Sequence, residues 1–513
     1  MTGTAPDAAA TDWFGERVAP EGAKRRSVRG IVVSALGRGT GQAINLAALL
    51  VLARLLTPAE FGLVAMVTAV VGIGALFQDL GLSGATLRLR RITHAQASNL
   101  FWINAAAGAL AALAIVASSP LLEAFYREPQ VRPIAAAMSL GLVCGGLGAQ
   151  HTALLRRMMK FTRLARITTL GALASAVAAV VAALEGAGPW ALVIGSLSGS
   201  LIATVLAWAA CDWRPGWPRR GVGTREAIRF GLHMLGFGVL GFLAKNIHTM
   251  LVGRYWGAAP AGLYGRAFAV ATRVNGAILG PLGVVVPAVM GGMAGDSERF
   301  RRYYYRGCAL TLMAVMPGVF VCLALPRELL AVVLGDQWLD AARPLQWLAI
   351  GALPQVLAHT TGWVYLSAGD SRAMLLWGVI GWGAMIAAAF VGVGFGIEGL
   401  ALASSATSIL LLWPCLRFAF SRTTLRIDDL FRALAGPLVA GATAAAVVAL
   451  ALHLAPPASA LVRLVAGSLG FVALYAVLAV SVFGQWALVV DVVAQLRDDR
   501  TGARGTTVAD ARG

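Results

Sequence analysis

The sequence predicts an all-α integral membrane protein with about fourteen transmembrane helices. Of its 513 residues, 58% are hydrophobic and only 13% are charged, and the mean hydropathy is +0.75. Ordinary soluble domains are roughly 45–50% apolar and about 25% charged. The apolar residues form long runs, and about twenty such residues are needed to cross a 30 Å hydrocarbon core. A water-soluble fold is therefore excluded.

Short polar segments separate these apolar runs along the whole chain. Each run is long enough for one membrane crossing. The expected spans are 30–53, 61–85, 100–119, 134–155, 167–184, 190–210, 230–253, 267–290, 307–325, 345–368, 373–394, 398–418, 433–454 and 461–483.

A repeated pattern indicates that the chain contains two related halves. The residues LAR at 52–54 and GL at 62–63 recur as VGR at 252–254 and GL at 262–263. In transporters an internal duplication builds two bundles around a central site. The alternative explanation is chance similarity between two helix ends.

The repeat and a long central polar segment predict two pseudo-symmetric six-helix bundles followed by a C-terminal helix pair. The expected division is a cytoplasmic N-terminal segment (1–29), a first bundle (30–210), a central cytoplasmic loop (211–229), a second bundle (230–420), a helix pair (421–484) and a cytoplasmic tail (485–513).

Arginine and lysine residues set the expected orientation. They gather in alternate loops, and positive residues are retained on the cytoplasmic side of the membrane. We therefore expect an inner-membrane protein with both termini in the cytoplasm. The formal charge of +18 is then explained by loops facing anionic lipid, and no nucleic-acid partner is expected. Members of the expected inner loops are Lys24, Arg25, Arg88, Arg90, Arg156, Lys160, Arg219, Arg225, Arg301, Arg372 and Arg422.

The expected outer loops are short. The longest runs from Pro326 to Pro344. Tryptophan is enriched at membrane–water interfaces, so we expect Trp338 to sit at the outer interface.

Arg38 and Asp79 are ionisable residues inside the first two expected spans. Each lies about nine residues, or about 13 Å, from the cytoplasmic end of its helix, so the two side chains could meet. One interpretation is a salt bridge that fastens the two helices. In the other, Arg38 binds an anionic headgroup and Asp79 acts in coupling or gating.

Lys245 and Arg273 lie at similar depth in the periplasmic half of the second expected bundle, and their two spans contain no acidic residue. Uncompensated charges in a membrane need water or a ligand of opposite charge. With Asn246 and Asn275 nearby, they predict a substrate-binding cavity that attracts anions. The alternative is that both cations reach toward the outer interface. Among the membrane histidines, His248 is the candidate for a titrating group.

The sequence predicts no catalytic residues, no metal site and no cofactor. It has neither a Walker-type phosphate-binding loop nor a His-Glu-x-x-His motif, and its five cysteines lack metal-ligand spacing. A secondary transporter or a passive flippase remains.

Several stretches of the chain carry a resemblance to a known family. The chain resembles the Wzx-type polysaccharide and oligosaccharide-lipid flippases, whose superfamily also holds multidrug extruders and the peptidoglycan-precursor flippase. The likeness covers roughly residues 28 to 420. Its residues are LARLLTPAEFGL (52–63), FQDLGL (77–82), ITHAQASNLFWIN (92–104), FYREP (125–129), NIHTMLVGRYWGAAPAGLY (246–264) and LGDQW (334–338).

The resemblance implies alternating access between two bundles that carry an undecaprenyl-diphosphate-linked glycan from the inner to the outer leaflet, for lipopolysaccharide or exopolysaccharide assembly. Implied partners are membrane lipids, a polysaccharide polymerase and export proteins. His248 departs from the acidic residue that many relatives have there, so a carboxylate coupling site does not carry over. The alternatives are a multidrug or cation antiporter, a peptidoglycan-precursor flippase, and a non-transporting component or enzyme of glycan assembly.

Overall fold

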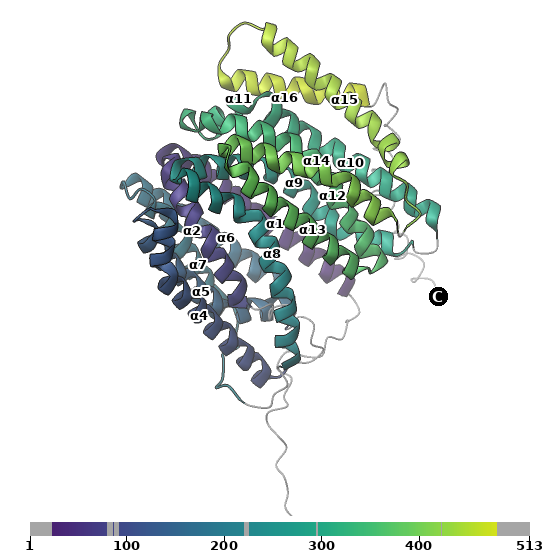
Figure 1. The fold of residues 1–513 in the computed structure, drawn as a ribbon. Helices are drawn as coiled ribbons and strands as arrows, with labels where there is room; N and C mark the ends of the chain where they lie inside the picture. The colour runs from purple at the N-terminus through teal and green to yellow at the C-terminus, as the bar shows by residue number, and fades with distance from the viewer. Residues whose placement is uncertain are drawn as a thin grey trace, which may run out of the picture. The chain divides into compact units, whose positions relative to one another are not determined.

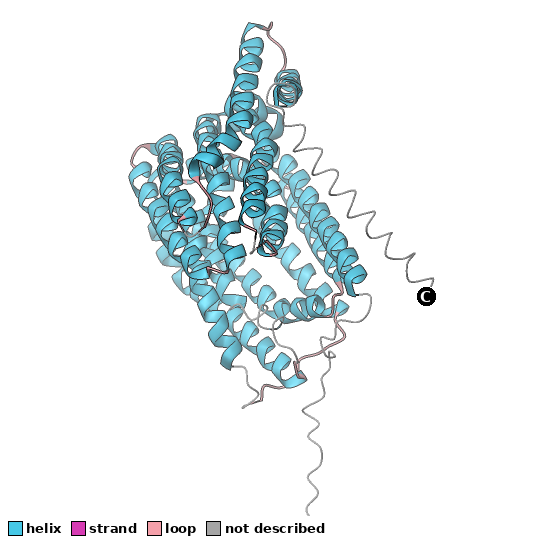
Figure 2. Cartoon of the chain, turned by 90° about the vertical axis from the view of Figure 1, so that its right-hand side faces the viewer, coloured by secondary structure: helices cyan, strands magenta, loops and turns pink. Residues whose placement is uncertain are grey.

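The computed structural model is built from helices (Figure 1). It describes residues 23–79, 86, 92–219, 225–293, 296–421 and 423–479. Within these ranges Figure 2 shows helices joined by loops, without a strand. The helices are α1 (Ala23–Leu55), α2 (Pro58–Asp79), α4 (His94–Tyr126), α5 (Val131–Arg157), α6 (Phe161–Leu184), α7 (Trp190–Ala210), α8 (Arg225–Trp256), α9 (Ala258–Gly291), α10 (Ser297–Ala324), α11 (Pro326–Val333), η2 (Asp336–Ala341), α12 (Ala342–Ala368), α13 (Ser371–Val393), α14 (Gly396–Phe420), α15 (Ile427–Leu454) and α16 (Ala460–Val477).

The long helices follow the expected spans one for one. Within the described ranges, 14 helices have 18 residues or more, and each overlaps one expected span. Ten of them are long and apolar enough to cross a membrane, which confirms the all-α membrane fold. The side chains of α8 and α9 are described only in part, and α12 is less apolar because it carries residues such as Gln355 and His359.

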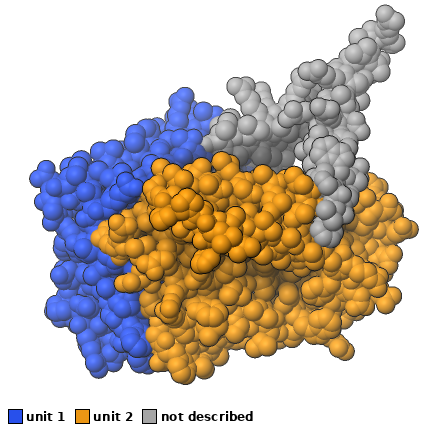
Figure 3. Space-filling model, turned by 90° about the horizontal axis from the view of Figure 1, so that it is seen from above, with its two compact units in different colours: residues 1–265 blue, residues 266–513 orange. Residues whose placement is uncertain are grey.

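Two compact units divide the chain, residues 1–265 and 266–513 (Figure 3). In the first unit α4 packs along α5, α6 along α7, and α1 against α6. Small residues allow this close packing, as is common between membrane helices. A β-carbon built on Gly195 of α7 would lie 2.8 Å from the carbonyl oxygen of Ser175 on α6. The predicted domain boundaries rest on the repeat and stay a prediction.

In the second unit α10, α12 and α14 pack together, and α15 and α16 pack against α10. Its core includes the buried hydroxyl pair of Tyr304 and Thr360, 2.9 Å apart, and a ring stack of Phe320 on Phe471. Proline removes a helical hydrogen bond and favours a bend, and membrane helices tolerate it where neighbouring groups satisfy the backbone. Internal prolines of this unit are Pro317, Pro354, Pro414 and Pro437.

The segment between α10 and α12 is not an open loop, because it folds into α11 and η2. The Trp338 indole is fully buried in protein, and its place at the outer interface stays a prediction. Helix α11 packs on α16, and the Glu328 carboxylate lies 3.1 Å from the Arg463 guanidinium. Composition cannot distinguish a tryptophan at an interface from one buried by a short helix folding back.

The burial of Trp338 predicts a large stability difference between two tryptophan truncations. Trp338→Ala leaves a cavity and should cost about 3–5 kcal/mol. Trp413→Ala removes an indole that is 53% exposed on α14 and should cost far less. Thermal unfolding of both variants in detergent, followed by size-exclusion chromatography, measures the difference. Equal melting temperatures would show that Trp338 is not a core residue.

Candidate functional site

The two copies of the repeat meet inside the first unit. Gly62 lies in the second turn of α2, and Gly262 lies at the same place in α9. A β-carbon on Gly62 would overlap the carbonyl oxygen of Ala258, and one on Gly262 would overlap that of Pro58. The contact is therefore reciprocal, with each glycine against the first residue of the other helix. This is the pattern of a two-fold axis, in which one patch contacts its own equivalent.

Helix α8 packs along α2, and glycine residues permit this close packing as well. A β-carbon on Gly253 would overlap Met66 of α2, and one on Gly72 of α2 would overlap the ring of Phe242 on α8. The Tyr126 hydroxyl donates to the backbone oxygen of Met66 at 3.3 Å. Glycine lets two helices approach closely in a membrane, so α8 packs directly on α2 within the first unit.

The predicted cations Lys245 and Arg273 are both exposed. Lys245 lies about 17 Å from the C-terminal end of α8, and Arg273 about 22 Å from the start of α9, at 1.5 Å per residue. Neither forms an ion pair or a side-chain hydrogen bond with the described residues. Arg266 precedes Arg273 by seven residues and so lies on the same face of α9.

The other predicted residues of these helices are more enclosed. Asn246 is half-buried, and its amide donates to the backbone oxygen of Phe242 at 2.9 Å. His248 is 2% exposed, and its ring stacks on Tyr264 with 5.9 Å between centroids. Asn275 is buried, and its Oδ1 has no hydrogen-bond partner within the described part of the chain.

The side chains of Arg38 and Asp79 lie outside the described residues. Arg38 lies within α1, and Asp79 is the last described residue of α2. The pairing of Arg38 with Asp79 therefore stays a prediction.

A docked loop was missed in the sequence. Residues 211–219 belong to the predicted central cytoplasmic loop, and they fold back onto the first turns of α4. The Trp213 indole donates to His94 Nδ1 at 3.1 Å. His151 of α5 completes an aromatic cluster, with its ring 4.4 Å from that of Trp208 and 5.2 Å from that of Trp213. Residues so far apart in the sequence carry no short-range signal of this packing.

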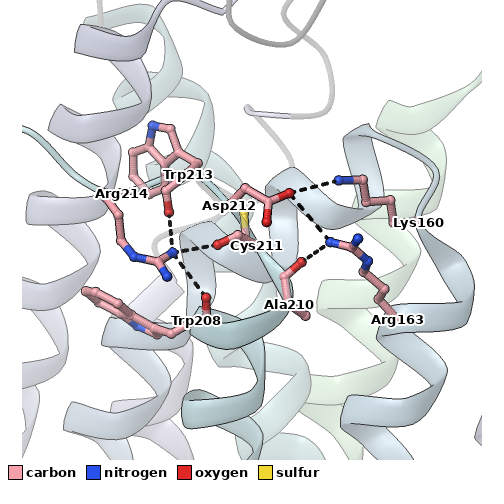
Figure 4. A network of polar contacts seen from close by, with 8 residues as sticks. All are labelled: Lys160, Arg163, Trp208, Ala210, Cys211, Asp212, Trp213 and Arg214. Carbon is pink, nitrogen blue, oxygen red and sulfur yellow. Dashed lines mark hydrogen bonds and ion pairs between the residues drawn. The ribbon is translucent and has the colours of Figure 1, made fainter.

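Arg214 fixes the start of this loop at the end of α7 (Figure 4). Its guanidinium donates to the backbone oxygens of Trp208, Cys211 and Trp213 at 3.1, 2.6 and 3.0 Å. The last carbonyls of a helix have no partner within the helix, and a cation there is favourable. Arg214 therefore caps α7.

A second contact ties the same point to α6 (Figure 4). Arg163 donates to the backbone oxygen of Ala210, and the Asp212 carboxylate lies 3.7 Å from both Lys160 and Arg163. These ion pairs are exposed, so each adds about 0–1 kcal/mol. They orient the loop where it leaves the helix.

A buried amide in α4 was not predicted from the sequence. Asn104 is fully buried, and neither Oδ1 nor Nδ2 has a hydrogen-bond partner within the described ranges. Its backbone oxygen lies 2.6 Å from the place of a β-carbon on Gly146. The signal available was a lone asparagine inside an apolar run.

Comparison with known proteins gives the family. Residues 51–343, more than half of the chain, match the family described as "Polysaccharide biosynthesis protein". The chain belongs to this polysaccharide biosynthesis family. The matched segment contains both copies of the repeat, the docked loop, Lys245 and Arg273.

Named relatives of this family member include two bacterial proteins. It is 24% identical over 345 residues to the lipopolysaccharide biosynthesis protein WzxC of Escherichia coli (strain K12), covering 66% of this chain and 68% of WzxC. It is 27% identical over 329 residues to the succinoglycan biosynthesis transport protein ExoT of Rhizobium meliloti (strain 1021), covering 64% of this chain and 66% of ExoT. The match thus spans about two thirds of each relative.

Solved structures show the fold of this family member. The lipid II flippase MurJ in an inward closed conformation superposes with a TM-score of 0.70 at 14% identity, covering 88% of this chain and 98% of that one. An inward-facing multidrug transporter of the MATE family gives 0.61 at 14% identity, over 76% and 96%. At such identity the likeness establishes the fold alone.

The reciprocal glycine contact predicts which small substitutions the family fold tolerates. Gly62→Ala and Gly262→Ala place a methyl group on a backbone oxygen, and overpacking of this kind costs about 1–3 kcal/mol. Gly265→Ala on the same helix is the matched control, because a β-carbon there would meet nothing within 4 Å. Melting temperature in detergent measures the effect. If all three variants melt together, the crossing is not close-packed.

Proposed function

We propose that this protein is a flippase that moves an undecaprenyl-diphosphate-linked oligosaccharide from the inner to the outer leaflet of the cytoplasmic membrane. The observation that carries the proposal is that Lys245 of α8 and Arg273 of α9 are each exposed deep within a helix of a polysaccharide-family chain. Charges in a membrane helix face a water-filled space or a partner. A diphosphate is such a partner, and its polyprenyl chain can remain in lipid.

The relatives support this substrate class. Their names describe the biosynthesis of lipopolysaccharide, succinoglycan and teichuronic acid, which are different polymers. Moving a lipid-linked saccharide across the membrane is a step that such pathways share. We infer that a polymerase and export proteins act on the product at the outer leaflet.

A multidrug or cation antiporter is the second candidate, because MATE transporters share the fold. A site for organic cations needs acidic groups inside the membrane. Asp79 apart, each acidic residue of the described α-helices stands in a first or last turn. The interior charges are basic instead, which favours an anionic substrate.

The contact at Gly62 and Gly262 supports alternating access as the mechanism. It joins equivalent points of the two repeats across a pseudo-two-fold relation, and inverted or parallel repeats around a central site are the architecture of alternating-access transporters. In this proposal Arg38 receives the diphosphate, Asn246 and Asn275 bind polar groups of the substrate, and Asp79 and His248 serve coupling or gating.

Removal of either cation should abolish export. Lys245→Ala and Arg273→Ala each lose a charge-assisted hydrogen bond of about 1.5–3 kcal/mol, equivalent to about tenfold or more in affinity. Lys245→Arg and Arg273→Lys keep the charge and should retain part of the activity. Arg327→Ala, an exposed arginine of α11, is the matched control. Cell-surface polysaccharide and membrane abundance are measured together, and normal export by both alanine variants would refute the role of the cations.

The orientation of the chain predicts which loops a membrane-impermeant thiol reagent reaches. In intact cells without an outer-membrane barrier, Ala187→Cys and Ala458→Cys should be labelled, because they follow outward-directed helices under the positive-inside rule. Thr424→Cys should be labelled only after permeabilisation. Four native cysteines are buried and Cys144 is half-buried, so the parent chain gives the background. The reverse labelling pattern would overturn the orientation.

A further inference from the structure

The docked loop and α4 each place one tryptophan ring on the surface of the first unit. Trp217 is 85% exposed and Trp102 of α4 is 40% exposed. Their ring planes are nearly parallel, at 10°, with 6.2 Å between centroids. Leaving apolar area in water costs about 25 cal/mol per Å². An exposed aromatic pair marks a place where lipid headgroups or a ligand are in contact with the protein.

Hydrogen bonds hold this pair in place. The Trp102 indole donates to the backbone oxygen of Gly216 at 2.9 Å, and the Gly216 amide donates to Ser98 Oγ at 3.0 Å. Asn99 and the backbone of Arg219 form two reciprocal bonds of 2.6 and 2.8 Å. Flanking prolines at 215 and 218 restrict the loop backbone further. The rings are thus ordered before anything binds, which lowers the entropic cost of binding.

The pair stands at the loop end of α4, at the edge of the hydrocarbon layer. Helix α4 has 33 residues, or about 50 Å, against a hydrocarbon core of about 30 Å. Its first turns carry His94, Ser98 and Asn99, and they bind an irregular loop whose backbone needs polar partners. Such a loop does not lie in lipid hydrocarbon. The rings are therefore in the zone of water and headgroups.

We propose that the Trp102–Trp217 pair is a stacking platform for the sugar rings of the saccharide on the cytoplasmic side. The apolar C–H face of a pyranose packs against an indole face, and polar groups around the ring bind its hydroxyls. Arg219 supplies such a group, since its side chain is exposed and forms no ion pair or hydrogen bond with described residues. This platform rests on the proposed function and adds glycan recognition before translocation.

The test uses the full chain in lipid nanodiscs and the lipid-free repeat-unit oligosaccharide released from the host's own polysaccharide. Trp217→Ala should weaken oligosaccharide binding about tenfold, equivalent to about 1.4 kcal/mol. Trp217→Phe keeps an aromatic face and should retain most of the affinity. Trp413→Ala, which removes an exposed indole from α14, is the control and should bind normally. An unchanged dissociation constant for Trp217→Ala, or no binding by the wild type, overturns the platform.

A quenching measurement separates sugar binding from membrane anchoring. The fluorescence difference between wild type and Trp217→Phe reports Trp217. The platform predicts quenching by aqueous acrylamide and protection by the oligosaccharide. Quenching by brominated lipid without such protection would make Trp217 an interfacial anchor and refute the proposal.

Reconstituted translocation distinguishes a failure of the tryptophan platform from a failure of the flippase function. If the wild type moves glycolipid and Trp217→Ala moves it with unchanged affinity and selectivity, the platform fails and the flippase stands. If the wild type moves no glycolipid, the flippase assignment fails whatever the oligosaccharide measurement gives.

Discussion

The arrangement of α2, α8 and α9 depends on one backbone crossing, where Gly62 and Gly262 leave no room for a side chain. A β-carbon at either glycine would push α2 and α9 apart. The packing of Gly253 on Met66 and of Gly72 on Phe242 adds two close contacts between α8 and α2. Membrane helices gain little from hydrophobic association, because lipid is as apolar as their side chains. Close van der Waals contact at the glycines is therefore a main source of the attraction between these helices.

That crossing lies beside a charged helix of the same unit. Helix α8, which carries Lys245 and His248, packs along α2 and α4. Burying a charge without a partner is expensive. Lys245 and Arg273 are exposed, so their side chains are accessible to an anionic ligand. His248 is buried, so its contacts are with neighbouring side chains.

The long apolar runs allowed the membrane fold and each long helix to be predicted from the sequence. The repeat at 52–63 and 252–263 indicated equivalent positions, but equivalence does not indicate contact, so the meeting of Gly62 with Gly262 could not be predicted. The same limit applies to Trp338 and to the loop at 211–219. The loop is held by residues of α4 more than a hundred positions away, and Trp338 is enclosed where η2 packs on α11 and α12. Hydropathy carries no information about either kind of packing. Of the candidate site, the cations Lys245 and Arg273 stand out in the sequence as charges inside apolar runs. Asn104 and the tryptophan pair do not, because an uncharged side chain in an apolar run does not indicate whether it is buried or exposed.

The most direct test of the flippase assignment is the leaflet distribution of undecaprenyl-diphosphate-linked oligosaccharide in cells depleted of this protein, probed in inverted and right-side-out vesicles. The account predicts that completed glycolipid accumulates in the cytoplasmic leaflet and is reached only in inverted vesicles. Normal appearance of the glycolipid in the outer leaflet after depletion would contradict it.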